Sequence, residues 1–483
     1  MINRLRNSIY SFLQKYWVLL AILVVFVVLR VVTTQLDAIP TWDAAVYVGM
    51  GKYLYSHGAI GTWEALRPIG LPIVLGAFWK IGIDPYSIGT TISLIISIGL
   101  LILTYLFAER IRPASGSIAA ALLAGAAVFF NFSAIPITDI TSTFFAMLSL
   151  YVVYRANTNR KYFIGGIVVA LAFMSRFPQG LLLVAAMLTI FIKMFYEKGK
   201  WEDRIGRLIE RGFIIAGGFF LIVIPYLISS YIFYGNAFLP FIEGTAVIKQ
   251  YPSLYQKGLW FYPWELLKQN PLFVFGLLPI ALLFKRKQRT VGIWVLASAI
   301  AIIAAYFTYE VHKETRYLLS FLPYVAVLSA IGIAYTLEYF KLPQLLFFGL
   351  FIIAGFMLNA GLLVHSFHNP DNKPMHDFES YLSKAPKARV LSSTPDIFAY
   401  TDVYMVRSLY SDWNDAYMAY NKLKGDTDYM MLNSCNLETG CADNAHCKDD
   451  KQLLLDTLAQ HDLEVFSTTT PSQCVLSIYK LAH

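Results

Sequence analysis

An aspartate at position 43 has surroundings that suit acid–base chemistry. Asp43 stands in the segment 41–47 (TWDAAVY), just beyond the first long apolar run. The aromatic and apolar neighbours predict a segment that lies along a membrane interface, where the carboxylate is partly desolvated. Desolvation raises the pKa of a carboxyl group toward the range useful for a general base. The alternative is a solvated aspartate that caps a short helix.

Three arginines stand at the ends of different apolar runs and suit the binding of an anion. Arg67 precedes a proline, Arg176 lies in the sequence Ser-Arg-Phe-Pro, and Arg316 comes directly before an apolar run. Guanidinium groups bind phosphate oxygens through two parallel hydrogen bonds. Snorkelling to lipid headgroups is the alternative for any one of them. Their recurrence at several run ends favours one shared anionic site.

Further residues are candidates for lining the same site. Asp139 opens an apolar run, where it is either a helix N-cap together with Thr138 or a second acidic group near Asp43. The other candidate lining residues are Tyr47, His57, Glu64, His312, Lys313 and Tyr317. The sequence contains no P-loop, no H-E-x-x-H motif, no protein-kinase motifs and no G-x-S-x-G with partners, so none of those chemistries is indicated.

The elements that must position these residues are membrane-spanning helices. The chain has 483 residues, of which 57% are hydrophobic and 14% charged, whereas soluble domains carry about 25% charged residues. A spanning helix needs about 20 mostly apolar residues. About eleven windows qualify or nearly do. They are 16–34, 87–108, 114–132, 139–155, 162–176, 180–196, 212–232, 271–284, 291–309, 317–337 and 344–364.

The distribution of basic residues predicts the orientation of the spans. Lysine and arginine gather in short loops such as 198–211 and 285–289, as is typical of cytoplasmic loops. We therefore expect a plasma-membrane protein with a cytoplasmic N-terminus and with the candidate residues on the outer side. The formal charge of +8 reflects these loops and does not indicate binding of nucleic acid.

The composition changes after residue 364, which divides the chain into two predicted domains. Residues 1–365 form a transmembrane domain whose first outer loop, 35–86, lies at the interface. Residues 366–483 form a soluble extracytoplasmic domain. An amphipathic helix at 450–461 and several strand-like runs predict a small α/β fold for it. The strand-like runs are 389–393, 428–432, 463–466 and 474–479.

All four cysteines lie in the second domain, at positions Cys435, Cys441, Cys447 and Cys474. Disulfides persist outside the cytoplasm, so we expect two bridges, with three connectivities open. A zinc site built from the four thiolates is the alternative, although the spacing does not match the usual C-x2-C pattern.

The membrane part of the chain resembles the GT-C glycosyltransferases, in particular the branch of protein O-mannosyltransferases and lipid A aminoarabinose transferases. Asp43 followed by Tyr47 after the first span carries part of the resemblance, and Arg67 with its proline carries another. Asp139 at the start of the fourth span also fits. The segment 315–324 (TRYLLSFLPY) is similar to the late Arg-Tyr-Leu-x-x-x-x-Pro signature of the family.

This resemblance implies a transferase that moves a sugar from a polyprenyl-phosphate-linked donor to an extracytoplasmic protein, lipid or glycan. Asp43 is then the catalytic residue, and Arg67, Arg176 and Arg316 bind the donor phosphate. No cofactor is certain, and the involvement of a divalent cation stays open. Many relatives have a second acidic residue directly after the first-loop aspartate, where this chain has Ala44.

Two other functions fit a polytopic membrane protein. A transporter or flippase of lipid-linked glycans would have broken helices near the bilayer midplane and symmetry between its halves. A non-catalytic membrane scaffold would lack a complete set of active-site residues, and Ala44 is the one feature that fits this alternative.

Overall fold

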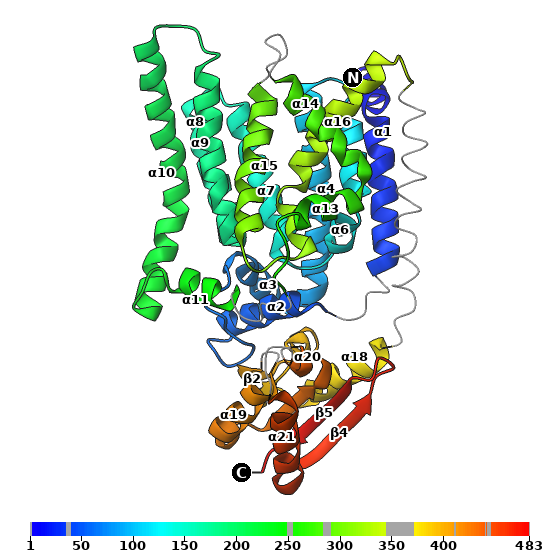
Figure 1. Ribbon diagram of the computed structural model, residues 1–483, viewed down its shortest axis with the longest axis vertical. Coiled ribbons are helices and arrows are strands. Elements are labelled where there is room, and N and C mark those ends of the chain that lie inside the picture. The colour runs from blue at the N-terminus through cyan, green and yellow to red at the C-terminus, as the bar shows by residue number, and fades with distance from the viewer. Residues whose placement is uncertain are drawn as a thin grey trace.

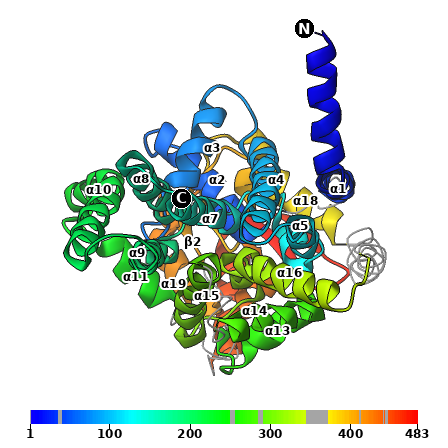
Figure 2. The ribbon, with the colours of Figure 1, turned by 90° about the horizontal axis from the view of Figure 1, so that it is seen from above.

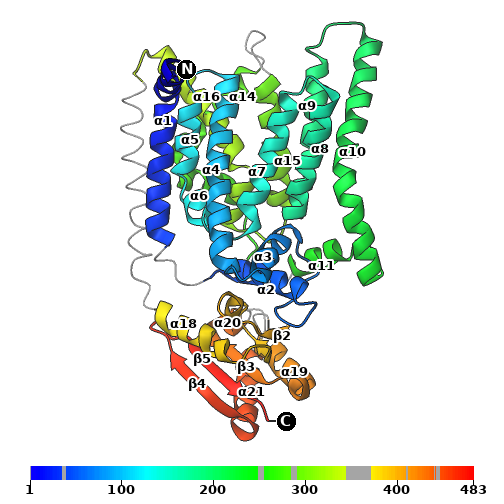
Figure 3. The same ribbon diagram turned by 180° about the vertical axis from the view of Figure 1, so that it is seen from behind.

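The computed structural model describes residues 2–34, 40–248, 255–283, 291–343, 371–409, 412–439, 441 and 446–482. A bundle of helices forms one end of the molecule, and a small sheet with its own helices forms the other (Figure 1). The N-terminus lies at the end of the bundle away from the sheet. Helices α2 (Trp42–Tyr55) and α3 (Gly70–Lys80) lie between the two parts, as the view from behind also shows (Figure 3).

The bundle contains helices that suit a lipid environment, because a helix satisfies its backbone hydrogen bonds within one segment. Six stretches among the described residues are long and apolar enough to cross a membrane, so the chain is a multi-pass membrane protein. Seen along the bundle, α1 and α10 lie at opposite edges (Figure 2). The long helices are α1 (Ile2–Thr34), α4 (Pro85–Ile111), α10 (Trp201–Tyr234), α15 (Val291–Tyr309) and α16 (Leu322–Tyr339). The sixth apolar stretch, Phe177–Met194, joins two shorter elements.

Several predicted spans are short or divided. The windows 114–132 and 271–284 are each split between two short elements, and the window 344–364 lies outside the described residues. The number of spans, about eleven, therefore stays a prediction. The shorter elements are α5 (Gly116–Ala124), α6 (Ala127–Phe132), α7 (Thr138–Tyr154), α8 (Asn159–Ser175), η1 (Phe177–Leu181), α9 (Leu182–Met194), α11 (Leu239–Ile248), α13 (Phe261–Gln269), η2 (Pro271–Gly276), α14 (Leu277–Leu282) and η4 (Thr315–Ser320).

The C-terminal residues form a five-stranded sheet with the strand order β2-β1-β3-β5-β4. Strands β2, β1 and β3 are parallel neighbours, whereas β5 is antiparallel to both β3 and β4. The four strand-like runs and the amphipathic helix of the sequence are confirmed, and β2 was not predicted. The strands are β1 (Arg389–Ser392), β2 (Tyr404–Ser408), β3 (Tyr429–Asn433), β4 (Leu463–Thr469) and β5 (Val475–Lys480). The helices around them are α18 (Asn372–Ser380), η5 (Tyr381–Lys384), η6 (Asp396–Ala399), α19 (Trp413–Leu423), η7 (Lys424–Asp426), α20 (Ser434–Glu438) and α21 (Cys447–His461).

The two faces of this sheet are buried against different partners. Successive strand residues point to opposite faces, and Leu391 and Met430 pack in a core with α19 and α21. Their neighbours Val390 and Met431 belong to a second core, on the opposite face, which contains residues of α18, η6, α2 and α3. The C-terminal sheet and helices α2 and α3 therefore share one hydrophobic core.

A buried lysine also joins α2 to the C-terminal domain. Lys52 is 4% exposed, and its Nζ donates to the carbonyl oxygens of Phe398 and Thr401, each at 2.8 Å. The same atom forms an ion pair with Asp402 at 2.9 Å. The ring of Phe398 lies so close to Gly49 that a Cβ at this glycine would come within 2.5 Å of it. Helix α2 is thus held on the side that faces the sheet.

The two expected disulfide bridges are present in the C-terminal domain. Cys435 pairs with Cys474, and Cys441 pairs with Cys447. The first bridge ties α20 to the segment that leads into β5. Because all four thiols are used in bridges, the alternative of a four-thiolate zinc site is wrong.

A buried pair of carboxyl groups lies in the same domain. Glu379 is fully buried, and neither of its carboxyl oxygens has a hydrogen-bond partner among the described residues. Burial, with the nearby Asp396 as a second cause, raises the pKa of Glu379 to about 9. Burial raises the pKa of Asp396 as well, against the hydrogen bond from Thr394. Glu379 is therefore protonated in the folded protein.

Removing the titratable group at position 379 should flatten the pH dependence of stability. The folded state keeps the proton on Glu379 where the unfolded chain, with a pKa of about 4.3, has released it. The free energy of unfolding must then fall as pH rises through this range. We expect the thermal midpoint of the full-length protein in detergent to fall between about pH 6 and about pH 8.5, and to fall less in Glu379→Gln. An equal fall in both proteins would contradict this. Asp377→Asn, an exposed site on the same helix, is the control.

Candidate active site

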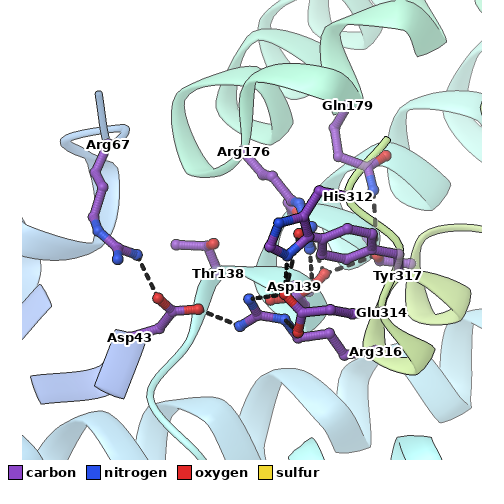
Figure 4. Close-up of polar contacts among 12 residues, drawn as sticks. Asp43, Arg67, Thr138, Asp139, Arg176, Gln179, His312, Glu314, Arg316 and Tyr317 are labelled. Atoms are coloured by element: carbon purple, nitrogen blue, oxygen red, sulfur yellow. Dashed lines mark hydrogen bonds and ion pairs between the residues drawn. The ribbon is translucent and has the colours of Figure 1, made fainter. Parts of the chain in front are cut away.

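Asp43, the second residue of α2, binds two arginines from distant parts of the chain. Its Oδ1 accepts a hydrogen bond from Nη1 of Arg67 at 2.7 Å, and its Oδ2 pairs with Nη1 of Arg316. Figure 4 shows the carboxylate between the two guanidinium groups. The side chains are only partly shielded from solvent, with exposures of 19% for Asp43, 14% for Arg67 and 21% for Arg316. The structure thus brings together three of the residues that the sequence singles out.

The pKa of Asp43 lies well below the usual range of an aspartate. Burial by itself raises this pKa, but electrostatic attraction and hydrogen bonds from Arg316 and Arg67 outweigh it. The rise expected from the interfacial surroundings is therefore wrong. It took account of the apolar neighbours in the sequence but not of guanidinium groups that only the fold brings near. In this conformation Asp43 is a firmly ionised and weakly basic carboxylate.

Arg67 is oriented by its own loop and by α2. It lies between α2 and α3, where its Nε donates to Oε2 of Glu64 at 2.6 Å. Its guanidinium carbon lies 5.3 Å from the ring centre of Tyr47, in cation–π contact. The hydroxyl of Tyr47 is 3.2 Å from Oγ1 of Thr138 at the start of α7. Glu64 and Tyr47, two of the expected lining residues, are therefore immediate neighbours of the Asp43 site.

Arg316 is held by a chain of partners in and beside η4. Glu314 binds it with both carboxylate oxygens, at 2.6 Å to Nε and 2.9 Å to Nη2. The ring of His312 pairs with the same carboxylate and stacks on Tyr255 with a centroid distance of 3.7 Å. Burial raises the pKa of Glu314, but His312 and Arg316 outweigh it and bring the pKa below its ordinary value. Glu314 and Tyr255 were not among the expected residues.

Arg176 reaches the same cluster from the end of α8. It is the C-cap residue of that helix and forms an ion pair with Asp139. Its guanidinium carbon lies 4.6 Å from the ring centre of Tyr317, and that of Arg316 lies 5.6 Å from the same ring. Tyr317 therefore contacts both arginines. The N-cap residue of α7 is Ile137, so Asp139 serves as the partner of Arg176 and not as a cap.

Two of the candidate residues lie elsewhere. His57 is exposed and follows the C-terminal end of α2, whose length of about 20 Å separates it from Asp43. Lys313 is 7% exposed, and its Nζ donates to the carbonyl oxygen of Lys257 at 2.8 Å. Neither side chain joins the cluster around Asp43.

The cluster is a network of paired charges. Each of its carboxylates, on Asp43, Glu64, Asp139 and Glu314, has a guanidinium partner. Among the described residues, no group of three or more His, Cys, Asp or Glu side chains is placed to hold a metal ion. An anion that enters the cluster would meet arginines whose guanidinium groups are already paired with carboxylates.

A family model described as dolichyl-phosphate-mannose-protein mannosyltransferase matches residues 67–228. This range includes Arg67, Asp139 and Arg176 but neither Asp43 nor Arg316. No curated protein matches the chain in sequence.

Solved structures cover more of the chain. ArnT from Cupriavidus metallidurans, bound to undecaprenyl phosphate, is 12% identical with a TM-score of 0.62, over 96% of this chain and 98% of that enzyme. The oligosaccharyltransferase AglB from Archaeoglobus fulgidus, in complex with an inhibitory peptide and dolichol-phosphate, is 13% identical with a TM-score of 0.57. That match covers 98% of this chain and 75% of AglB.

The fold is therefore that of the GT-C glycosyltransferase superfamily, to which the matched family and both enzymes belong. The resemblance seen in the sequence is confirmed at this level.

Proposed function

We propose that this protein is a membrane glycosyltransferase that moves a sugar from a polyprenyl-phosphate-linked donor to an extracytoplasmic acceptor. The observation that supports it most is the ionised Asp43 between Arg67 and Arg316. Arg176 adds a third guanidinium group to the same cluster through Tyr317. Enzymes with this fold have been solved with undecaprenyl phosphate and with dolichol-phosphate, which supports a polyprenyl phosphate as the donor class.

The donor phosphate and the carboxylate of Asp43 compete for the same guanidinium groups in this proposal. Both are oxyanions that an arginine binds in a two-point geometry. When the phosphate takes over Arg67 and Arg316, Asp43 loses the positive charges that lower its pKa. Its proton affinity then rises. Donor binding thus turns a weakly basic carboxylate into a general base.

Transfer of the sugar then exchanges one bond at its anomeric carbon for another. The nucleophilic atom of the acceptor gives its proton to Asp43 and bonds to the anomeric carbon of the sugar. The bond from that carbon to the phosphate oxygen breaks, and its electron pair stays on the phosphate. The arginines stabilise the charge that develops there. Glu314 keeps Arg316 in place when Asp43 releases it, because it binds that guanidinium through both of its oxygens.

We infer a positioning role for the C-terminal domain in the same reaction. Residues 44–52 of α2 are buried, and the face of α2 turned to the sheet is fixed by Lys52 and by the contact between Gly49 and Phe398. Asp43 opens this helix. A rigid α2 keeps its carboxylate within reach of Arg67 and Arg316, as a preorganised site requires.

Replacing the proposed base should abolish transfer without disturbing the fold. In Asp43→Asn the side chain keeps its shape but accepts no proton, so we expect transfer to fall by about 100-fold or more. The measurement is incorporation of radiolabelled hexose or pentose from polyprenyl-phosphate-linked donors into membranes that lack the endogenous enzyme. The control is Asp84→Asn, because Asp84 caps α4 by accepting from the backbone of Ser87 and is not among the residues that contact Asp43. Transfer by Asp43→Asn at the wild-type rate would overturn the role of Asp43.

We also propose that the C-terminal domain lies outside the cell and that the loop between α9 and α10 lies in the cytoplasm. The disulfides of the domain support the first assignment, and the basic residues of the loop support the second.

Thiol labelling of intact cells tests this orientation, because the native cysteines are all in bridges. We expect a membrane-impermeant maleimide to label Ser383→Cys, at an exposed position of the C-terminal domain. It should label Lys198→Cys, at an exposed position of the loop between α9 and α10, only after permeabilisation. The opposite pattern would show that the orientation is reversed.

A further inference from the structure

A cavity lies at the end of the helical bundle opposite to Asp43. Its volume is about 570 Å³, and its walls come from the ends of α4, α7 and α9 and the start of α8. Helix α4 begins beside α3 and is 27 residues long, which corresponds to roughly 40 Å. Its last turn therefore lies far from α2, α3 and the C-terminal domain (Figure 3). The cavity is separate from the site around Asp43.

Four basic residues from four different helix ends line this cavity. Arg110 stands in the last turn of α4, and Arg155 is the C-cap residue of α7. Lys161 lies in the first turn of α8, and Lys193 in the last turn of α9. Within the part of the chain that the structure describes, none of the four forms an ion pair. Their recorded partners are uncharged, such as Tyr151 for Arg155 and Asn157 for Lys161.

Lys193 forms a fixed part of the cavity wall. Its Nζ donates to the carbonyl oxygens of Ala156 at 2.6 Å and Val153 at 3.3 Å, and to the hydroxyl of Tyr162 at 3.2 Å. These bonds secure the end of α7 and hold one positive charge in place. Arg110, Arg155 and Lys161 are exposed, so a ligand can reach them from solvent.

One carboxylate, Glu197, also lines the cavity, but its charge is already balanced. Arg207 binds its Oε2 at 3.0 Å, and Arg211 pairs with its Oε1. Neither arginine belongs to the cavity wall. The net charge that a ligand meets in the cavity is therefore positive.

The surroundings of the cavity are typical of the level of the lipid headgroups. Phe195, Tyr196 and Trp201 follow the end of α9 and are 54%, 50% and 48% exposed. Aromatic side chains at a helix end are typical of the membrane interface. Basic pockets between helix ends at this depth on the cytoplasmic side suit phosphate-bearing headgroups. The hydroxyl of Tyr154 is a further polar group of the lining.

We propose that this cavity is a second anion site, which binds the phosphate group of a ligand on the side opposite to the proposed active site. Arg110, Arg155 and Lys161 contact the phosphate oxygens, and Lys193 adds a fixed charge behind them. An anionic phospholipid of that leaflet and a soluble phosphate compound share this chemistry. The site uses none of the residues proposed for transfer, so its failure and the failure of the proposed function are distinguishable.

Native mass spectrometry of the purified full-length protein tests the proposal with defined probes. The probes are phosphatidylglycerol, the neutral phosphatidylcholine and inorganic phosphate. The variants are Lys161→Gln and Arg155→Gln. Arg160→Gln is the matched control, because Arg160 is exposed, adjacent to Lys161 and not part of the lining. All three variants lose one positive charge at an exposed position, so equal thermal midpoints will show that the fold is intact.

We expect phosphatidylglycerol to bind about fivefold more weakly to each lining variant than to wild type, and equally well to Arg160→Gln. Phosphatidylcholine should not discriminate among the proteins. This result assigns a lipid headgroup to the site. Weaker binding of inorganic phosphate alone, with phosphatidylglycerol unaffected, would assign a soluble phosphate ligand. If neither probe distinguishes Lys161→Gln and Arg155→Gln from Arg160→Gln, the proposal is overturned.

Discussion

The double ion pair of Asp43 with Arg67 and Arg316 is the interaction on which the proposed site depends. It joins helix α2, the segment between α2 and α3, and the short helix η4 before α16. Arg67 and Arg316 keep Glu64 and Glu314 as partners when Asp43 releases them. A phosphate that replaces the carboxylate of Asp43 balances the charge that Asp43 no longer balances. Exchange of partners is therefore the first step of the proposed reaction.

Contacts with other parts of the molecule hold these three side chains in position relative to one another. Tyr47 and Thr138 connect α2 to α7, and Glu314 orients Arg316 from within its own segment. On its other side α2 shares a hydrophobic core with the C-terminal sheet, so the C-terminal domain is part of the support of the site. The close contact of Gly49 with Phe398 leaves no space for a larger residue there. Helix α2 is thus confined between two parts of the protein.

Residue type and position relative to the apolar runs were sufficient to predict much of this. Asp43 was singled out because its neighbours are aromatic and apolar. Arg67, Arg176 and Arg316 were singled out because guanidinium groups at the ends of several spans need anionic partners. Four strands of the C-terminal domain were recognised from their apolar runs, whereas β2, at one edge of the sheet, was not.

Interactions between distant segments could not be predicted. The pKa of Asp43 is lowered, not raised as expected, because of two arginines that are far from it in the sequence. The burial of Lys52 depends on carbonyl groups of the C-terminal domain, and nothing near it in the sequence indicates them. His57 belongs to the same predicted outer loop as Asp43, but the length of α2 separates the two residues.

The competition between carboxylate and phosphate is the central claim, and equilibrium binding tests it most directly. The measurement is the affinity of undecaprenyl phosphate for purified wild type, Asp43→Asn and Arg316→Gln. An asparagine no longer holds the two guanidinium groups by charge, so we expect Asp43→Asn to bind the phosphate several-fold more tightly than wild type, and Arg316→Gln more weakly. Binding by Asp43→Asn as weak as that of Arg316→Gln would contradict the account.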